Sequence, residues 1–275
     1  MSVEQEVARH YTHGALERAI LDALAASGKD VDGLSAADLS AADEFHLGWR
    51  AATLELAKDL DLQPGMHVLD VGSGIGGPAR TFAEMHGCRV TGIDLTQEFV
   101  DVANALTRRC GLADLVSFRQ VSALSLPFAD GSFDAATLIH VGMNVEDKAA
   151  LFAEVRRALK PGARFAVYDV VRLADGDLPY PMPWAATAGT SFVEPADAYR
   201  RKLAAAGFEL EAEVDRSALA LELGREMREK AARQGVPPLG LHVLMGPASP
   251  ERLSNVMGAL GRGIIGPVEF LVRAA

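Results

Sequence analysis

The spacing of hydrophobic residues along the chain changes near residue 66. Before that point, apolar residues such as Leu16, Ile20 and Leu24 recur every four positions, which predicts helices. After it, short apolar runs alternate with stretches of helical spacing, a pattern typical of a parallel sheet with helices on both faces. We therefore predict an α/β fold with a doubly wound, mostly parallel, seven-stranded sheet. The expected strands cover residues 66–71, 89–93, 116–121, 133–140, 164–170, 208–214 and 268–272.

Breaks at glycine and proline divide the chain into three segments. Residues 1–62 predict an N-terminal helical cap, and residues 63–172 predict a core domain. Residues 173–275 are expected to hold a lid segment rich in proline and aromatic residues, the remaining strands and a helical insertion. The stretch 235–266 is interrupted by Gly and Pro and predicts no definite element.

Charge and composition narrow the function classes. The chain has 275 residues, with 27 Lys and Arg against 37 Asp and Glu, and a formal net charge of -10. Without a basic tract it is a poor partner for nucleic acids or anionic membrane surfaces, which bind through clustered cations. Its two cysteines are too few for a disulfide framework, and the N-terminus lacks the apolar stretch of a signal peptide. No window approaches the about 20 apolar residues that span a bilayer. We expect a cytoplasmic protein, and the pattern indicates no oligomeric state.

The strongest local signal is a glycine-rich turn between the first core strand and the helix that follows it. The turn contains Gly72, Gly74 and Gly77, and the missing side chains let a ligand approach the backbone. The N-terminus of the next helix favours an anionic group. Asp94 ends the second strand, 22 residues after Gly72 (94 − 72), where a carboxylate can accept both hydroxyls of a ribose. This combination indicates either a dinucleotide or S-adenosylmethionine (SAM).

Four stretches around the turn decide between these two cofactors. They read VLDVGSG at 68–74, VTGID at 90–94, LPFADGSFD at 126–134 and LKPG at 159–162. With these stretches in this order, the chain resembles the class I SAM-dependent methyltransferases. Two further sequences, FHLG at 45–48 and HVGMN at 140–144, make it similar to small-molecule methyltransferases of the glycine/sarcosine and ubiquinone-biosynthesis type. The resemblance implies a Rossmann-like methyltransferase fold with SAM as its cofactor.

The resemblance also implies which residues hold the cofactor. The glycine turn would cradle the methionine end of SAM, Asp70 would face its amino group, and Asp94 would hold the ribose. Ser122 and Ala123 lie at the tip of the third strand, where adenine would bind. Many relatives have an aspartate at the position of Ser122, so a contact from the Ser122 hydroxyl or a backbone amide is expected instead. Arg50 is either a partner of the SAM carboxylate or a solvated helix charge. The complete set is Asp70, Gly72, Ser73, Gly74, Asp94, Leu95, Ser122, Ala123 and Arg50.

The fourth expected strand ends at His140, beside the glycine turn, where ligands bind in doubly wound sheets. Three roles stay open for His140: a general base for the acceptor, a contact without proton transfer, and a structural residue that shapes the pocket. Tyr11, Asn144, Tyr180 and Trp184 are candidates for binding the acceptor, with packing or helix capping as the alternative. The other histidines show no ligand spacing, which predicts no metal site.

Three functions are compatible with these residues. The first is in-line transfer of the SAM methyl group to N, O or C of a small-molecule acceptor, which releases S-adenosylhomocysteine (SAH). The second is SAM binding without catalysis, since an intact loop indicates binding and not turnover. The third is a nicotinamide-dependent oxidoreductase, whose short-chain members use Tyr-x-x-x-Lys. No tyrosine of this chain has a lysine four residues further on, and the first function is the one we expect.

Overall fold

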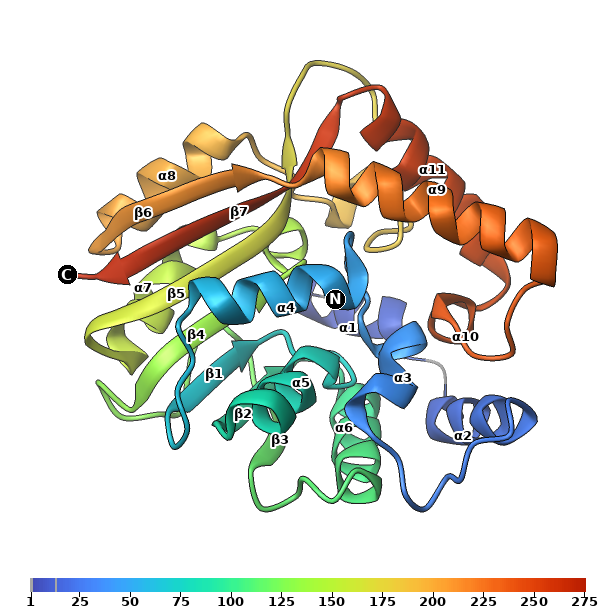
Figure 1. The fold of residues 1–275 in the computed structure, drawn as a ribbon. Helices are drawn as coiled ribbons and strands as arrows, with labels where there is room; N and C mark the ends of the chain where they lie inside the picture. Colours follow the sequence, from blue (N-terminus) through green and yellow to red (C-terminus); the bar gives the residue numbers. More distant parts are fainter. Residues whose placement is uncertain (1, 13) are drawn as a thin grey trace.

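One seven-stranded sheet organises the computed structural model, which describes residues 2–12 and 14–275 (Figure 1). The strands are β1 (His67–Val71), β2 (Arg89–Asp94), β3 (Val116–Gln120), β4 (Phe133–Ile139), β5 (Leu159–Arg172), β6 (Phe208–Asp215) and β7 (Ile265–Ala274). They lie in the order β3-β2-β1-β4-β5-β7-β6. The pairs among β1 to β5 are parallel, whereas β7 runs antiparallel to both β5 and β6. The prediction of a mostly parallel, seven-stranded sheet is confirmed.

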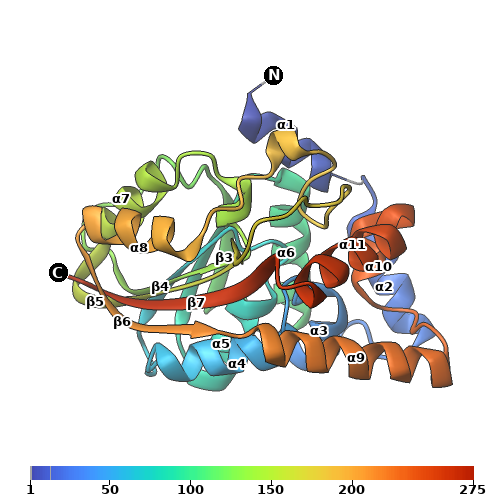
Figure 2. The ribbon, with the colours of Figure 1, turned by 90° about the horizontal axis from the view of Figure 1, so that it is seen from above.

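Helices cover both faces of this sheet, as the alternation of strands and helices predicts. One face is covered by α4 (Trp49–Asp59), α5 (Gly77–His86) and α6 (Gln97–Arg109). The opposite face is covered by α7 (Lys148–Ala158) and α8 (Ala196–Ala205). Leu56, Phe82 and Val100 belong to the core on the first face, and Phe152 and Tyr199 to the core on the second. Figure 2 shows α4 and α5 on one side of the strands and α7 and α8 on the other.

A further group of helices lies at the carboxyl ends of the parallel strands (Figure 1). The group comprises α1 (Val3–Tyr11), α2 (Leu16–Ala26) and α3 (Ala36–Asp43) before the sheet, and α9 (Ser217–Gln234), α10 (Leu241–Met245) and α11 (Ser249–Gly261) between β6 and β7. Short 3-10 helices are η1 (Gly142–Asn144), η2 (Ala188–Thr190) and η3 (Gly246–Ala248). Ile20 and Leu39 share one core cluster with Phe99 of α6 and Leu244 of α10, so the two halves of the group pack together. No helix within the described residues is both long and apolar enough to cross a membrane.

Two segments differ from the sequence expectation. β5 begins at Leu159, five residues earlier than expected, because residues 160–162 continue the strand. Leu159 already pairs with Phe133 of β4, which holds this early start in the sheet. The stretch 235–266 folds as α10, η3, α11 and the start of β7. Its helices are stabilised by packing against residues distant in sequence, so the local pattern does not reveal them.

Candidate active site

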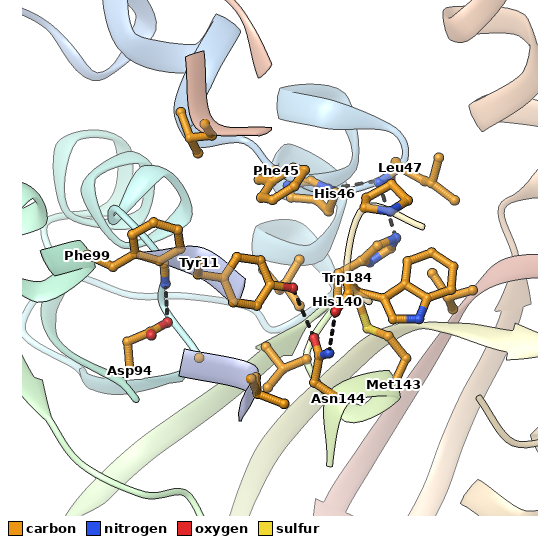
Figure 3. A pocket seen from close by; sticks show the side chains of 18 of the residues that line it. Tyr11, Phe45, His46, Leu47, Asp94, Phe99, His140, Met143, Asn144 and Trp184 are labelled. Carbon is orange, nitrogen blue, oxygen red and sulfur yellow. Dashed lines mark hydrogen bonds between the residues drawn. The ribbon is translucent and has the colours of Figure 1, made fainter. Parts of the chain in front are cut away.

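A cavity of about 730 Å³ lies at the carboxyl ends of β1, β2 and β4, where doubly wound sheets bind their ligands (Figure 3). Its wall combines the glycine turn with side chains from α1, α6 and the inserted helices α9 to α11. The structure brings these expected site residues together in the wall: Tyr11, Asp70, Gly72, Ser73, Gly74, Asp94, Leu95, Ala123, His140, Asn144 and Trp184. Arg50, Ser122 and Tyr180 are not among the described residues of the wall.

The glycine turn adopts backbone conformations that residues with a side chain rarely take. Gly72 and Gly74 have φ angles of 71° and 54°. A Cβ atom on Gly72 would lie 2.2 Å from a methyl carbon of Val141, so only glycine fits beside the loop after β4. The N–H of Ser73 donates to the carbonyl of Ile93 at 2.8 Å, which fixes the turn to β2. The turn therefore presents its backbone to a ligand.

The carboxylate of Asp94 binds the same turn. Its Oδ2 accepts a hydrogen bond from the N–H of Gly74 at 2.9 Å, and its Oδ1 accepts one from the N–H of Thr96 at 2.8 Å. Burial raises the pKa of Asp94, and the backbone hydrogen bonds from Thr96 and Gly74 partly oppose this rise. Each carboxylate oxygen has two lone pairs, so both can still accept a hydroxyl. Phe99 lies beside Asp94 and offers an apolar surface to a base (Figure 3).

Asp70 contributes a buried oxygen atom without a partner. The side chain is 2% exposed, and its Oδ1 accepts a hydrogen bond from the hydroxyl of Thr137 at 2.8 Å. Its Oδ2 has no hydrogen-bond partner among the described residues. Burial raises the pKa of Asp70 to about 7. A cationic group in the cavity would satisfy this oxygen, so the residues present fit the ammonium group of SAM.

Two residues expected at the cofactor have partners elsewhere. The hydroxyl of Ser122 donates to the carboxylate of Glu4 on α1, a residue of the cavity wall. The guanidinium of Arg50 donates to the hydroxyl of Thr81 at 2.7 Å and lies 3.9 Å from the fully buried carboxylate of Glu44. The structure therefore places Ser122 in a contact with α1 and Arg50 in a contact with α5.

The imidazole of His140 uses both of its nitrogen atoms for hydrogen bonds. Nε2 accepts the N–H of Leu47 at 3.1 Å, and Nδ1 lies 3.3 Å from the carbonyl of Tyr168. Burial and the nearby His46 hold the pKa of His140 well below its usual value, so the ring is neutral. The carbonyl of Leu47 in turn accepts the hydroxyl of Tyr168 at 2.7 Å. His140 and Tyr168 thus hold both polar groups of Leu47, and the lone pair of Nε2 is occupied.

A chain of hydrogen bonds joins α1 to the loops after β4 and β5. The hydroxyl of Tyr11 donates to Oδ1 of Asn144 at 3.1 Å, and Nδ2 of Asn144 donates to the carbonyl of Trp184 at 2.8 Å (Figure 3). Burial raises the pKa of Tyr11, so its hydroxyl stays protonated. The indole N–H of Trp184 donates to Ser191 at 2.9 Å. Tyr180, expected in this group, is not in the described wall; it packs against the hydrophobic cluster that contains Trp184 and Met143.

Sequence reasoning did not assign several wall residues to the site. His46 lies in the wall, 5.8 Å from His140 between ring centres, and its Nε2 lies 2.9 Å from a carboxylate oxygen of Glu44. The FHLG stretch that marked the resemblance was the available signal for it. Met227 and Met257 of the inserted helices also line the cavity, and no local sequence pattern predicts this position for them. Among the described residues, no group of three or more His, Cys, Asp or Glu side chains is placed to hold a metal ion.

Comparison with protein families identifies a domain in the central part of the chain. Residues 69–167 match the family model described as a methyltransferase domain. The sterol 24-C-methyltransferase ERG6B of Gibberella zeae is 40% identical over 114 residues, which are 42% of this chain and 30% of that protein. The sterol methyltransferase-like 1 of Botryococcus braunii is 44% identical over 110 residues, which are 40% of this chain and 28% of that protein. The chain spans about a third of the length of the curated relatives it matches.

Solved structures match the chain over nearly its whole length. The [4+2]-cyclase SpnF has a TM-score of 0.70 and 26% identity, covering 98% of this chain and 96% of that chain. The geranyl diphosphate C-methyltransferase of Streptomyces coelicolor A3(2) has a TM-score of 0.70 and 20% identity, covering 100% and 99%, which is a likeness of fold alone. The match to the methyltransferase domain, the sheet order and the glycine turn bound by Asp94 all point to the same kind of fold. Residues 69–167 of the chain form a methyltransferase domain.

Proposed function

We propose that the protein transfers the methyl group of SAM to a small-molecule acceptor and releases SAH. One observation carries the proposal. The carboxylate of Asp94 accepts the N–H of Gly74, so a ribose acceptor and a glycine turn form one preorganised site. The methyltransferase domain matched over residues 69–167 includes both elements. The unpartnered Oδ2 of Asp70 adds a negative atom in the same wall, which suits a cationic ligand.

When bound, SAM supplies a methyl group already activated on a sulfonium. The chain then has to align the acceptor with that methyl group and exclude water. In the proposal Asp94 holds the ribose hydroxyls, Leu95 and Ala123 pack against adenine, and Asp70 pairs with the ammonium group. The backbone of the glycine turn receives the remaining polar groups of the methionine end.

The acceptor would lie against the wall that contains Tyr11, Asn144 and Trp184. These three are fixed by their hydrogen bonds to one another, so they offer a preformed surface. We assign His140 a positioning role, because its Nε2 lone pair already receives the N–H of Leu47. A base is required only when the nucleophile must lose a proton in the reaction.

Calorimetry with SAM, SAH and NAD tests the cofactor assignment. We expect SAM and SAH to bind and NAD not to bind. Asp94→Ala should lower SAM affinity by about 1.5–3 kcal/mol, or about 10- to 150-fold, because hydrogen bonds to a charged group are lost. Asp101→Ala is the matched control, since it removes the same charge from an exposed position on α6. Unchanged SAM affinity in Asp94→Ala, with the control also unchanged, would refute the ribose assignment.

A second candidate is suggested by the solved structure that is 26% identical over nearly the whole chain. That protein is named as a [4+2]-cyclase, so this architecture also accompanies a reaction other than methyl transfer. A turnover assay with a pool of candidate acceptors separates the two activities. Formation of SAH together with a product heavier by one methylene group supports methyl transfer. Conversion of an acceptor to an isomer of equal mass, without SAH formation, supports cyclisation. SAM binding without either product would indicate a non-catalytic protein.

A further inference from the structure

One wall of the cavity is built from an apolar helix face. On α11, Pro250, Leu253 and Met257 recur at spacings of three and four and all line the cavity. Val7 of α1 and the half-exposed Met227 of α9 belong to the same wall. Leu253 and Met257 are only partly buried by the protein. An apolar face that the chain itself does not fully cover is suited to an apolar ligand.

The charged residues that line the cavity are mainly acidic. Six of the described lining residues are aspartates or glutamates, whereas Arg228 is the one lysine or arginine among them. Arg228 lies on the exposed surface of α9. Arg252 of α11 is half-buried and is not in the described lining. Its guanidinium lies 3.5 Å from the carbonyl of Met245, its Nε has no hydrogen-bond partner among the described residues, and its charge acts on Tyr11 of the wall. An anion bound in the cavity would therefore meet mainly carboxylates in the described lining, whose one lysine or arginine is the exposed Arg228.

We propose, on the basis of the proposed function, that the acceptor is an uncharged, mainly hydrocarbon molecule that binds against the apolar face of α11. Burying an unpaired anion is costly, and placing it beside like charges adds several kcal/mol. Phosphorylated and carboxylated acceptors should thus bind more weakly than uncharged ones. The apolar part of an uncharged acceptor gains free energy in proportion to the area it buries on Leu253 and Met257. These two side chains would set which hydrocarbon skeletons fit.

The contrast with a structural neighbour sharpens this proposal. The geranyl diphosphate C-methyltransferase of Streptomyces coelicolor A3(2) was solved with Mg²⁺, geranyl diphosphate and SAH. In the described part of the present chain, no group of three or more His, Cys, Asp or Glu side chains is placed to hold a metal ion. The lining described for the present chain contains no lysine, and its one arginine is the exposed Arg228.

A matched pair of probes tests the proposal on the SAH-loaded protein. Farnesol and farnesyl diphosphate share one hydrocarbon chain and differ in charge, and the diphosphate is supplied with Mg²⁺. The two tryptophans of the chain, Trp49 and Trp184, both line the cavity, so their fluorescence reports its occupation. We expect saturable binding of farnesol that is at least about tenfold tighter than that of the diphosphate. Leu253→Arg should reverse this preference by adding a cation to the wall.

Val236→Arg is the control, because Val236 is 74% exposed and lies outside the described lining. It should leave the preference for farnesol unchanged. Diphosphate binding as tight as that of farnesol in the unmodified protein overturns the proposal, and so does the absence of saturable binding by farnesol. The comparison on the unmodified protein decides the matter even if Leu253→Arg does not fold. SAH affinity is measured separately by calorimetry, so failure of the cofactor assignment is recognised independently.

Discussion

Replacement of His140 distinguishes a proton acceptor from a residue that holds Leu47 in place. In the structure the Nε2 atom of His140 accepts the Leu47 N–H at 3.1 Å, and the ring is buried and neutral. Three substitutions separate the two roles. Gln reaches as far as Nε2 and offers an oxygen to Leu47, whereas Asn is shorter and Ala offers nothing. His140 has a φ of 54°, a conformation that Asn tolerates well, so Asn adds little backbone strain.

The expected magnitudes follow from these contacts. Loss of the acceptor leaves the buried N–H of Leu47 unpaired, which costs about 1–3 kcal/mol of folding stability. His140→Ala and His140→Asn should lose that amount, and His140→Gln should recover most of it. If His140 were a general base, all three variants would lose roughly 10²- to 10⁴-fold in turnover. If His140 only positions Leu47, the variants that lose stability should also lose turnover. His140→Gln should then keep a turnover close to that of the unmodified enzyme.

The assay combines denaturant unfolding with steady-state turnover between pH 6 and 8. Because the pKa of His140 is held well below its usual value, the ring stays neutral throughout this range. We therefore expect no loss of kcat that titrates with His140 as the pH falls from 8 to 6. SAM affinity should be unchanged in His140→Gln. A collapse of kcat in His140→Gln with normal stability and normal SAM binding would overturn the positioning role and restore the base.

Three further outcomes are expected. In cofactor-free protein the pKa of Asp70 is about 7, so its pairing with the SAM ammonium should strengthen as the pH rises from 6 to 8, and calorimetry should find this slope absent in Asp70→Asn. Arg80 is fully buried and donates to Asp43 at 2.7 Å, so Arg80→Met should lower the free energy of unfolding by about 3–5 kcal/mol in urea denaturation, with partial recovery on adding Asp43→Leu. Ser122→Ala should speed hydrogen exchange in α1, because the hydroxyl holds Glu4, and should leave SAM affinity unchanged. A loss of about 0.5–1.5 kcal/mol in affinity would instead place Ser122 at the adenine.

The parts of the site that depend on local sequence were predictable. Gly72, Gly74 and Asp94 lie at strand ends within one βαβ unit, so spacing alone brings them to one edge of the sheet. Arg50 and Ser122 were assigned to the cofactor by resemblance. In the structure, their side chains are held by hydrogen bonds to Thr81 and Glu4. The partner of Ser122 lies 118 residues away in sequence, on α1.

Contacts between residues distant in sequence also explain which features of the site could not be predicted. The hydrogen bond that occupies the Nε2 atom of His140 spans 93 residues. The inserted helices α10 and α11 are stabilised by packing against α2, α3 and other distant elements, so the Gly- and Pro-rich stretch 235–266 carries no local signal for them. Sequence reasoning therefore found the part of the cavity built on the sheet, together with Tyr11 and Trp184, and missed the part built by α9 to α11.

The inserted helices leave and rejoin the sheet at one point. Asp215 at the end of β6 pairs with Val268 of β7, and the N–H of Arg216 donates to the carbonyl of Pro267 at 2.9 Å. Residues 216–264 therefore form a contiguous module whose two ends are already joined through the sheet. Exchange of this module with that of a relative would replace the α9–α11 wall and keep the glycine turn and Asp94 intact. The wall proposed to bind the acceptor can therefore be exchanged as one segment, without any change to the residues proposed to hold the methyl donor.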